Sequence, residues 1–189
     1  SGSNGNGDSG GSTTSDGGTS GGTTSGGNGE SIAIAALEPQ SGPFAPWANV
    51  HVQGLRIGID EVNASDMLNR DLELVVTDTG SDPSEASSAF QRHVEVDDAV
   101  AVTGPVSSDV GIRTARTAEE LQVPNLLHMA GSEDILSSDT RHVFRTGWLP
   151  SSSHARADAQ YFEQNDVGYV GAIVADYAWG RSIESALER

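Results

Sequence analysis

Two hydroxyl side chains, Ser107 and Ser108, follow an apolar run that ends in Gly-Pro. The run covers residues 99–103, and its small and β-branched side chains are typical of a strand buried on both faces of a sheet. A helical pattern begins at the serines, so unpaired backbone N–H groups would point outward beside Ser108. Such a turn at the carboxyl end of a parallel strand can hold an anion or a polar ligand. The alternative is that Ser107 or Ser108 only caps the helix.

The sequence gives little support for catalysis or metal binding. Residues 5–10 match G-x-G-x-x-G and residues 7–11 match G-x-S-x-G, but both matches lie in a glycine-rich stretch with no element to hold them rigid. Beyond that stretch, no nucleophile, base and acid form a set, and the turn at 103–108 lacks the glycine fingerprint of nucleotide sites. None of the five histidines shows ligand spacing: His51, His93, His128, His142 and His154. We therefore predict no enzyme activity, no cofactor and no metal site.

The elements that would position Ser108 alternate between strand and helix. Strands are predicted at 32–37, 72–78, 99–103, 124–129 and 142–146. Helices are predicted from Pro46 to about Asn63, after Asp82 as N-cap, over about 108–121, and after Pro150. Alternation of this kind predicts βαβ units and a parallel sheet, for which we expect the order 2-1-3-4-5. A further strand at 167–176 has the composition to begin a second sheet, and a helix follows it to Arg189.

Several motifs in chain order resemble one known family. They are Phe44 and Trp47 after Ser-Gly-Pro, Gly-Leu-Arg-Ile-Gly-Ile-Asp-Glu-Val-Asn at 54–63, Asp-Pro-Ser-Glu-Ala at 82–86, Thr-Gly-Pro-Val-Ser-Ser at 103–108, Val-Pro at 123–124, Phe-Arg-Thr-Gly at 144–147 and Asp-Tyr-Ala-Trp-Gly at 176–180. Together they resemble the type I periplasmic binding fold, above all the branched-chain amino-acid-binding proteins of ABC importers and their amide-, urea- and aromatic-acid-binding relatives. The Gly-Gly-Ile turn frequent in that family after the first helix is replaced by residues 66–70.

The resemblance implies a doubly wound α/β fold with two lobes and a ligand clamped between them. Residues 31–149 would form the first lobe, and residues 150–189 would form a crossover helix and the start of an incomplete second lobe. The implied function is that of an extracellular solute-binding protein of an ABC importer, which delivers an amino acid, an amide or a urea-like ligand to a membrane permease. We expect a monomer. The alternative is a ligand-sensing domain of a receptor or regulator with the same fold.

The resemblance also implies the ligand contacts. Ser108 would hold a carboxylate or amide oxygen, and the loop after the fourth strand would add a backbone carbonyl and a second hydroxyl from Ala130, Gly131 and Ser132. Aromatic walls would come from Trp47, Tyr177 and Trp179. Trp47 could instead cover the helix start, and Tyr177 could be an ordinary aromatic at a strand end. Asp109 would repel a ligand carboxylate, so an uncharged amide or a urea-like compound is an alternative ligand.

Residues 1–30 differ in composition from the rest of the chain. Gly, Ser and Thr make up 24 of them, with no aliphatic or aromatic residue. Such a segment cannot bury enough surface to offset its ordering entropy, so we predict a disordered tether. Its likeness to the tethers of surface lipoproteins implies export by a signal sequence and a lipid anchor through a residue before Ser1.

The net charge of −17 includes ten basic residues that are all Arg, and cysteine is absent. An acidic surface disfavours binding to nucleic acid or to anionic lipid surfaces. The acidic excess without Lys resembles proteins of salt-loving archaea, in which salt screens self-repulsion. The alternative is an ordinary acidic protein of a mesophile.

Overall fold

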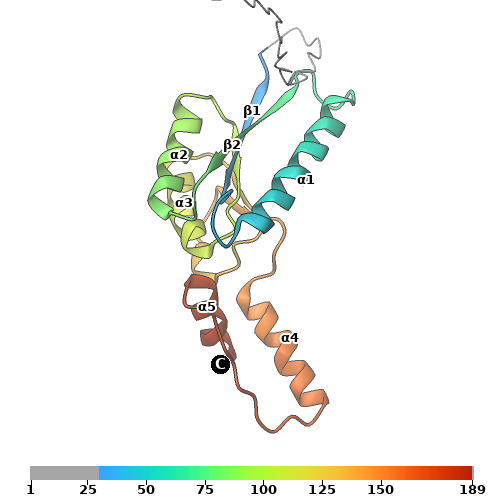
Figure 1. Cartoon of the computed structure of the whole chain (residues 1–189), viewed down its shortest axis with the longest axis vertical. Coiled ribbons are helices and arrows are strands. Elements are labelled where there is room, and N and C mark those ends of the chain that lie inside the picture. Colours follow the sequence, from blue (N-terminus) through green and yellow to red (C-terminus); the bar gives the residue numbers. More distant parts are fainter. Residues whose placement is uncertain (1–29, 189) are drawn as a thin grey trace, which may run out of the picture.

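A computed structural model describes residues 30–188. They form a parallel sheet flanked by helices, and a further pair of helices lies beyond the carboxyl ends of the strands (Figure 1). The five strands are β1 (Ile32–Glu38), β2 (Leu72–Asp78), β3 (Ala101–Thr103), β4 (Asn125–Leu127) and β5 (Val143–Arg145). All neighbouring pairs are parallel, and the order is β2-β1-β3-β4-β5. The predicted α/β class and strand order are therefore confirmed.

Strand β1 occupies the interior of the sheet because its small side chains suit a position covered on both faces. It pairs with β2 over its full length and with β3 over three residues. Ala35, Ala36 and Leu37 are fully or almost fully buried. The last residue of β1, Glu38, is also buried, which is uncommon for an acidic side chain. This strand therefore places a carboxyl group at the carboxyl edge of the sheet.

Helices cover both faces of the sheet. The helix α1 (Ala45–Asn63) lies on one face, and α2 (Pro83–Glu95) and α3 (Ser108–Leu121) lie side by side on the other (Figure 1). The Asp82 carboxylate caps α2 as predicted, because it accepts hydrogen bonds from the N–H groups of Ser84 and Glu85 at 2.8 Å. Phe90 of α2 lies in the main hydrophobic cluster, which also contains residues of α3 and of four strands.

Two further helices, α4 (Ser151–Gln164) and α5 (Ala178–Leu187), pack against each other beyond the carboxyl edge of the sheet (Figure 1). The strand predicted at 167–176 is wrong, since this segment has no regular structure. A strand needs a paired neighbour, and none lies beside this segment within the part of the chain that the structure describes. Its apolar side chains are exposed instead, with Tyr169 at 89% exposure and Ile173 fully exposed.

The structure changes the bounds of several other predicted elements. Strand β3 begins at Ala101 rather than at residue 99, and β4 and β5 are each three residues long, shorter than predicted. The last helix ends at Leu187, before the end of the chain. Helix α3 spans 108–121 as predicted.

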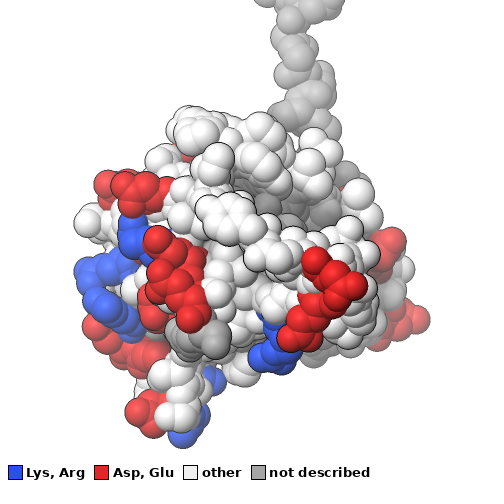
Figure 2. Space-filling view, turned by 90° about the horizontal axis from the view of Figure 1, so that it is seen from below, with Lys and Arg blue, Asp and Glu red and all other residues white. Residues whose placement is uncertain are grey.

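The surface carries the acidic excess of the composition. Figure 2 shows the end that bears α4 and α5, where charged side chains, mostly acidic, lie at the left, right and lower parts of the view and the middle and upper parts carry little charge. None of the helices within residues 30–188 has the length and apolar character to cross a membrane. The predicted tether falls outside the described residues, apart from Glu30.

Candidate functional site

A pocket of roughly 240 Å³ lies where the carboxyl edge of the sheet meets the start of α5. Its lining residues come from five separate stretches of the chain: Phe44, Trp47, Val106, Ser108, Met129, Trp148, Tyr177 and Trp179. Four of the predicted site residues line it, namely Trp47, Ser108, Tyr177 and Trp179. The lining is apolar except for a few hydrogen-bonding groups, which is the usual make-up of small-molecule sites.

Ser108 is buried at the first position of α3, and its side chain reaches across to the next loop. The hydroxyl oxygen accepts hydrogen bonds from the N–H groups of Gly131, at 3.1 Å, and Ser132, at 3.2 Å. Because the oxygen is the acceptor in both bonds, the hydroxyl hydrogen can be donated to a ligand in the pocket. Ser107 stands at the N-cap, and its side chain makes no capping hydrogen bond. The structure therefore does not support the capping interpretation for either serine.

The loop of Ala130, Gly131 and Ser132 lies behind the pocket wall. The Ser132 hydroxyl is fully buried and accepts a hydrogen bond from the N–H of Asp134 at 3.3 Å, so it caps a short 3-10 helix, Glu133–Ile135. A Cβ atom on Gly131 would lie 2.9 Å from both Trp148 and Trp179. The backbone of Gly131 thus supports the two indole rings, and only glycine leaves them this space.

Aromatic rings form most of the pocket wall. Phe44 lies 6.4 Å from Trp47 and 5.8 Å from Tyr177, and Tyr177 lies 6.5 Å from Trp179, measured between ring centroids. Trp47 projects from the first turn of α1 and remains half exposed at the pocket rim. Burial, with a smaller contribution from the charge of Asp109, raises the pKa of the Tyr177 phenol, so Tyr177 is neutral at physiological pH.

Sequence reasoning missed four lining residues as ligand contacts: Phe44, Val106, Met129 and Trp148. Each follows or adjoins a strand end or turn that was recognised. Trp148 directly follows the Phe-Arg-Thr-Gly motif, and Phe44 was noted only as part of the Ser-Gly-Pro turn. Large apolar side chains just beyond the carboxyl ends of parallel strands were the available signal.

Asp109, expected to repel a ligand carboxylate, points toward α5 instead. Its carboxylate accepts a hydrogen bond from the N–H of Ala178 at 3.3 Å and pairs with Arg181 at 3.4 Å. A negative charge at a helix N-terminus is favourable, so the Asp109 carboxylate stabilises the start of α5. The expected repulsion between Asp109 and a ligand carboxylate is therefore weaker than the sequence suggested.

Further contacts fix α5 over the pocket. The Ser182 hydroxyl accepts a hydrogen bond from the N–H of Glu133 at 3.1 Å and also bonds to the Ser151 hydroxyl. Trp179, in the first turn of α5, has a buried indole N–H with no hydrogen-bond partner among residues 30–188. Because a buried donor without a partner is costly, this N–H is the second group that a ligand oxygen would satisfy.

Comparison with known proteins gives matches in both sequence and fold. The family model described as "Periplasmic binding protein" matches residues 31–189. The Leu/Ile/Val-binding protein BraC3 of Rhizobium johnstonii is 27% identical over 159 residues, which cover 83% of this chain and 43% of BraC3. The chain spans between 29% and 43% of the length of the curated relatives that it matches.

Two of the solved structures that share the fold show the extent of the likeness. The leucine-binding protein LivK of Thermotoga maritima superposes with a TM-score of 0.71 at 21% identity, over 83% of this chain and 44% of LivK. A solute-binding protein of an ABC transporter from Rhodopseudomonas palustris, solved with 3,4-dihydroxybenzoic acid, gives a TM-score of 0.76 at 16% identity, over 84% of this chain and 43% of its own.

Proposed function

The chain belongs to the periplasmic binding protein family, and we propose that it acts as the solute-binding component of an ABC importer on the outer side of the membrane. The observation that carries this proposal is the pocket at the carboxyl edge of the sheet, closed on its far side by Tyr177 and Trp179. Ligands of open parallel sheets bind at this edge. The likeness to BraC3, a Leu/Ile/Val-binding protein, and to the solute-binding protein of an ABC transporter from Rhodopseudomonas palustris favours transport over sensing.

The proposed arrangement divides the ligand contacts between two lobes. Residues 31–149 form the first lobe, and residues 150–189 are the crossover and the start of the second. The first lobe supplies Ser108 and the aromatic side chains that follow its strands, and the second supplies Tyr177 and Trp179. Closure of two lobes around a ligand is a common hinge motion. The ABC permease is the proposed membrane partner.

The pocket chemistry defines the ligand class. Ser108 and Trp179 offer two hydrogen-bond donors, and the N-terminus of α3 beside them favours negative charge. The remaining wall is apolar and rich in aromatic rings. We propose a small amino acid or related amide whose polar head contacts Ser108. The aromatic wall also favours a second candidate, a small aromatic acid stacked between Trp47 and Tyr177.

A ligand screen on the chain tests this proposal. Thermal denaturation is followed with leucine, isoleucine, valine, their amides, urea, benzoate and 3,4-dihydroxybenzoate, and the positive compounds are titrated by calorimetry. We expect at least one class to raise the melting temperature, since a ligand that binds only the native state stabilises it.

Matched serine variants locate the site. Ser108→Ala is expected to weaken ligand binding by about 1–3 kcal/mol, since it removes a buried hydrogen bond and leaves two N–H groups without an acceptor. The control is Ser87→Ala, because Ser87 is equally buried but bonds to Thr117 between α2 and α3. It should lower stability and leave ligand affinity unchanged. Equal affinity in the unaltered protein and the Ser108 variant would place the ligand elsewhere.

A further inference from the structure

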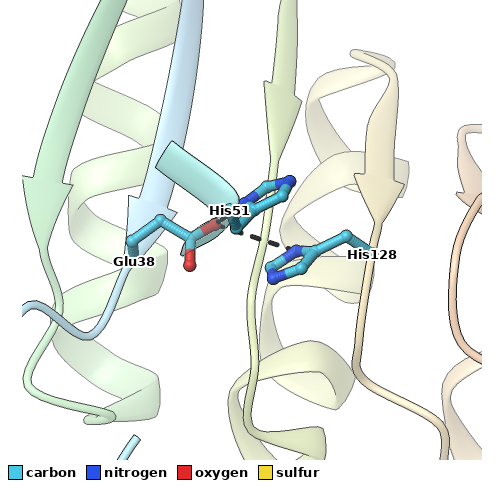
Figure 3. A group of neighbouring side chains, drawn as sticks. All are labelled: Glu38, His51 and His128. Atoms are coloured by element: carbon cyan, nitrogen blue, oxygen red, sulfur yellow. Dashed lines mark hydrogen bonds and ion pairs between the residues drawn. The ribbon is translucent and has the colours of Figure 1, made fainter. Parts of the chain in front are cut away.

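Three side chains from different elements converge at the carboxyl edge of the sheet, beside the ligand pocket (Figure 3). Glu38 is the last residue of β1, His51 lies in α1, and His128 directly follows β4. Their ligand atoms all lie within 4.8 Å of one another. Neither sequence spacing nor a shared helix links them, so the fold alone brings them together.

The contacts within the cluster are close. Nδ1 of His51 lies 2.5 Å from Oε1 of Glu38, and Nδ1 of His128 lies 3.7 Å from the same oxygen. The two imidazole rings stack in parallel with their centroids 3.4 Å apart. A Cβ atom on residue 104 would lie 3.2 Å from Oε1 of Glu38, so Gly104 leaves the space that the carboxyl group occupies.

Several polar atoms of the cluster are buried without a partner. Glu38 is fully buried, and its Oε2 atom accepts no hydrogen bond within the described part of the chain. Both ring nitrogens of His128, a side chain only 13% exposed, also have no hydrogen-bond partner in residues 30–188. Buried polar groups of this kind are almost always satisfied, and an unpartnered one destabilises the folded state. Three such atoms in one place indicate a bound species that satisfies them.

We propose that Glu38, His51 and His128 bind one divalent transition-metal ion of the zinc type. Two imidazoles and one carboxylate are a common ligand set for Zn²⁺, and the ring nitrogens must be neutral to bind it. Metal–ligand bonds of about 2.0–2.2 Å place donor atoms up to about 4.4 Å apart, so small movements bring all three to one ion. One of the two parallel rings must turn about its Cβ–Cγ bond, so that both lone pairs point to the ion.

The position of the cluster gives the ion an open side. His51 and His128 line a second cavity together with Pro46, Trp47, Val50, Met129 and Trp148. Trp47, Met129 and Trp148 also line the ligand pocket, so the two cavities share a wall. An ion with three protein ligands keeps its fourth position for water or an incoming donor. This position faces the cavity, and the ion ties α1 to two strand ends beside the pocket.

Titration of the metal-free chain with Zn²⁺ tests the proposal. After dialysis against a chelator, calorimetry should show one equivalent of Zn²⁺ bound, and Co²⁺ should give a visible absorption band that Zn²⁺ abolishes. His51→Gln and His128→Gln should each lower the affinity at least about tenfold, since loss of even an outer partner of a ligand costs 10- to 100-fold.

His142→Gln is the matched control. His142 contacts the carboxylate of Glu119 at 3.0 Å, as His51 contacts Glu38, but no second histidine joins that pair within the described residues. This variant should bind Zn²⁺ as the unaltered chain does. If His128→Gln does not fold, His51→Gln still allows the comparison, because His51 lies in α1 rather than in the sheet and its side chain is 18% exposed. The proposal is overturned if no one-to-one Zn²⁺ complex forms, or if His51→Gln binds Zn²⁺ as tightly as His142→Gln does.

Discussion

The carboxylate of Asp109 accepts a hydrogen bond from the backbone N–H of Ala178, 3.3 Å away, at the junction of α3 and α5. Asp109 lies in the first turn of α3 and faces the first turn of α5, so one negative charge interacts favourably with two helix N-termini. The contact lies next to Ser108 in the chain and next to Tyr177 and Trp179 in space. The contact between Asp109 and Ala178 thus holds Tyr177 and Trp179 on the side of the pocket opposite the Ser108 hydroxyl.

Removal of the Asp109 carboxylate should loosen α5. Asp109→Ala leaves the N–H of Ala178 without its acceptor, so we expect a loss of about 0.5–2 kcal/mol in unfolding free energy, as for a lost N-cap. Tryptophan fluorescence should shift to longer wavelength as Trp179 becomes hydrated. Arg181→Ala is the control, because the ion pair of Asp109 and Arg181 is exposed and contributes about 0–1 kcal/mol. An equal fluorescence shift in Asp109→Ala and Arg181→Ala would show that the lost ion pair, and not the lost hydrogen bond to Ala178, causes the change.

Glycine at position 131 should be required for the pocket, though not for the fold of the sheet. In Gly131→Ala, the added Cβ atom would lie 2.9 Å from both Trp148 and Trp179, so the indoles must move. We expect loss of ligand-induced stabilisation, measured by thermal denaturation with the ligands that bind the unaltered chain. Gly54→Ala is the matched control, because a Cβ atom there meets nothing within 4 Å. Because Gly54 lies in the interior of α1, Gly54→Ala should raise the free energy of unfolding by about 0.5–1 kcal/mol. Unchanged ligand response in Gly131→Ala would contradict the proposed pocket.

The alternation of strand and helix was sufficient to predict the sheet, because each buried strand carries its own short-range signal. Ile32–Glu38 is apolar up to its last residue, Leu72–Asp78 is mostly apolar or β-branched, and Asp82 marks the start of α2 by its capping chemistry. The segment 167–176 carries the same kind of signal but lacks a neighbouring strand in the described structure. Propensity alone does not form a strand, because the backbone hydrogen bonds of a strand require a partner.

The side chains that gather at the sheet edge were harder to predict. Ser108 was found because a strand, a turn and a helix start identify it locally. The contact between Glu38 and His51 joins residues 13 positions apart on different elements, and His128 comes from a third. Histidine spacing along the chain gave no indication of this cluster, since the distance between these side chains depends on the packing of α1 over β1. Trp148 joins the pocket because it follows β5, whose end lies beside the end of β4.

Acid should weaken the contact between α3 and the start of β5 through Glu119. Its carboxylate accepts hydrogen bonds from the N–H groups of Arg141 and His142, and the bond from His142 is the largest cause that lowers the pKa of Glu119 below its usual 4.5. The folded protein therefore holds this proton less tightly than the unfolded chain does. The stabilisation is present above about pH 4.5 and is lost as the pH falls through the lowered pKa.

Comparison with Glu119→Gln measures this contribution. The difference in unfolding free energy between the two proteins should be largest near neutral pH and shrink in acid, and it should stay below about 1 kcal/mol because the side chain is partly exposed. Denaturant unfolding at a series of pH values gives the difference. A constant difference across the series would show that the Glu119 charge does not contribute.

Salt should stabilise the protein because its charge is strongly one-sided. The chain carries 27 acidic and ten basic residues, and exposed carboxylates repel one another across the folded surface. The Debye length falls from about 10 Å at 0.1 M to about 3 Å at 1 M salt, so most of this repulsion disappears over that range. We expect the melting temperature to rise substantially in KCl, as for proteins adapted to high salt.

Two controls separate screening from other effects of salt. Sucrose stabilises proteins by exclusion from the surface without screening charge, so it should not reproduce the steep rise at low concentration. A variant with Asp60→Asn and Glu61→Gln, both exposed on α1, carries less repulsion and should respond less to KCl. A melting temperature that is flat between about 0.1 M and 1 M KCl, the range over which the Debye length shortens most, would show that self-repulsion does not limit the stability of this fold.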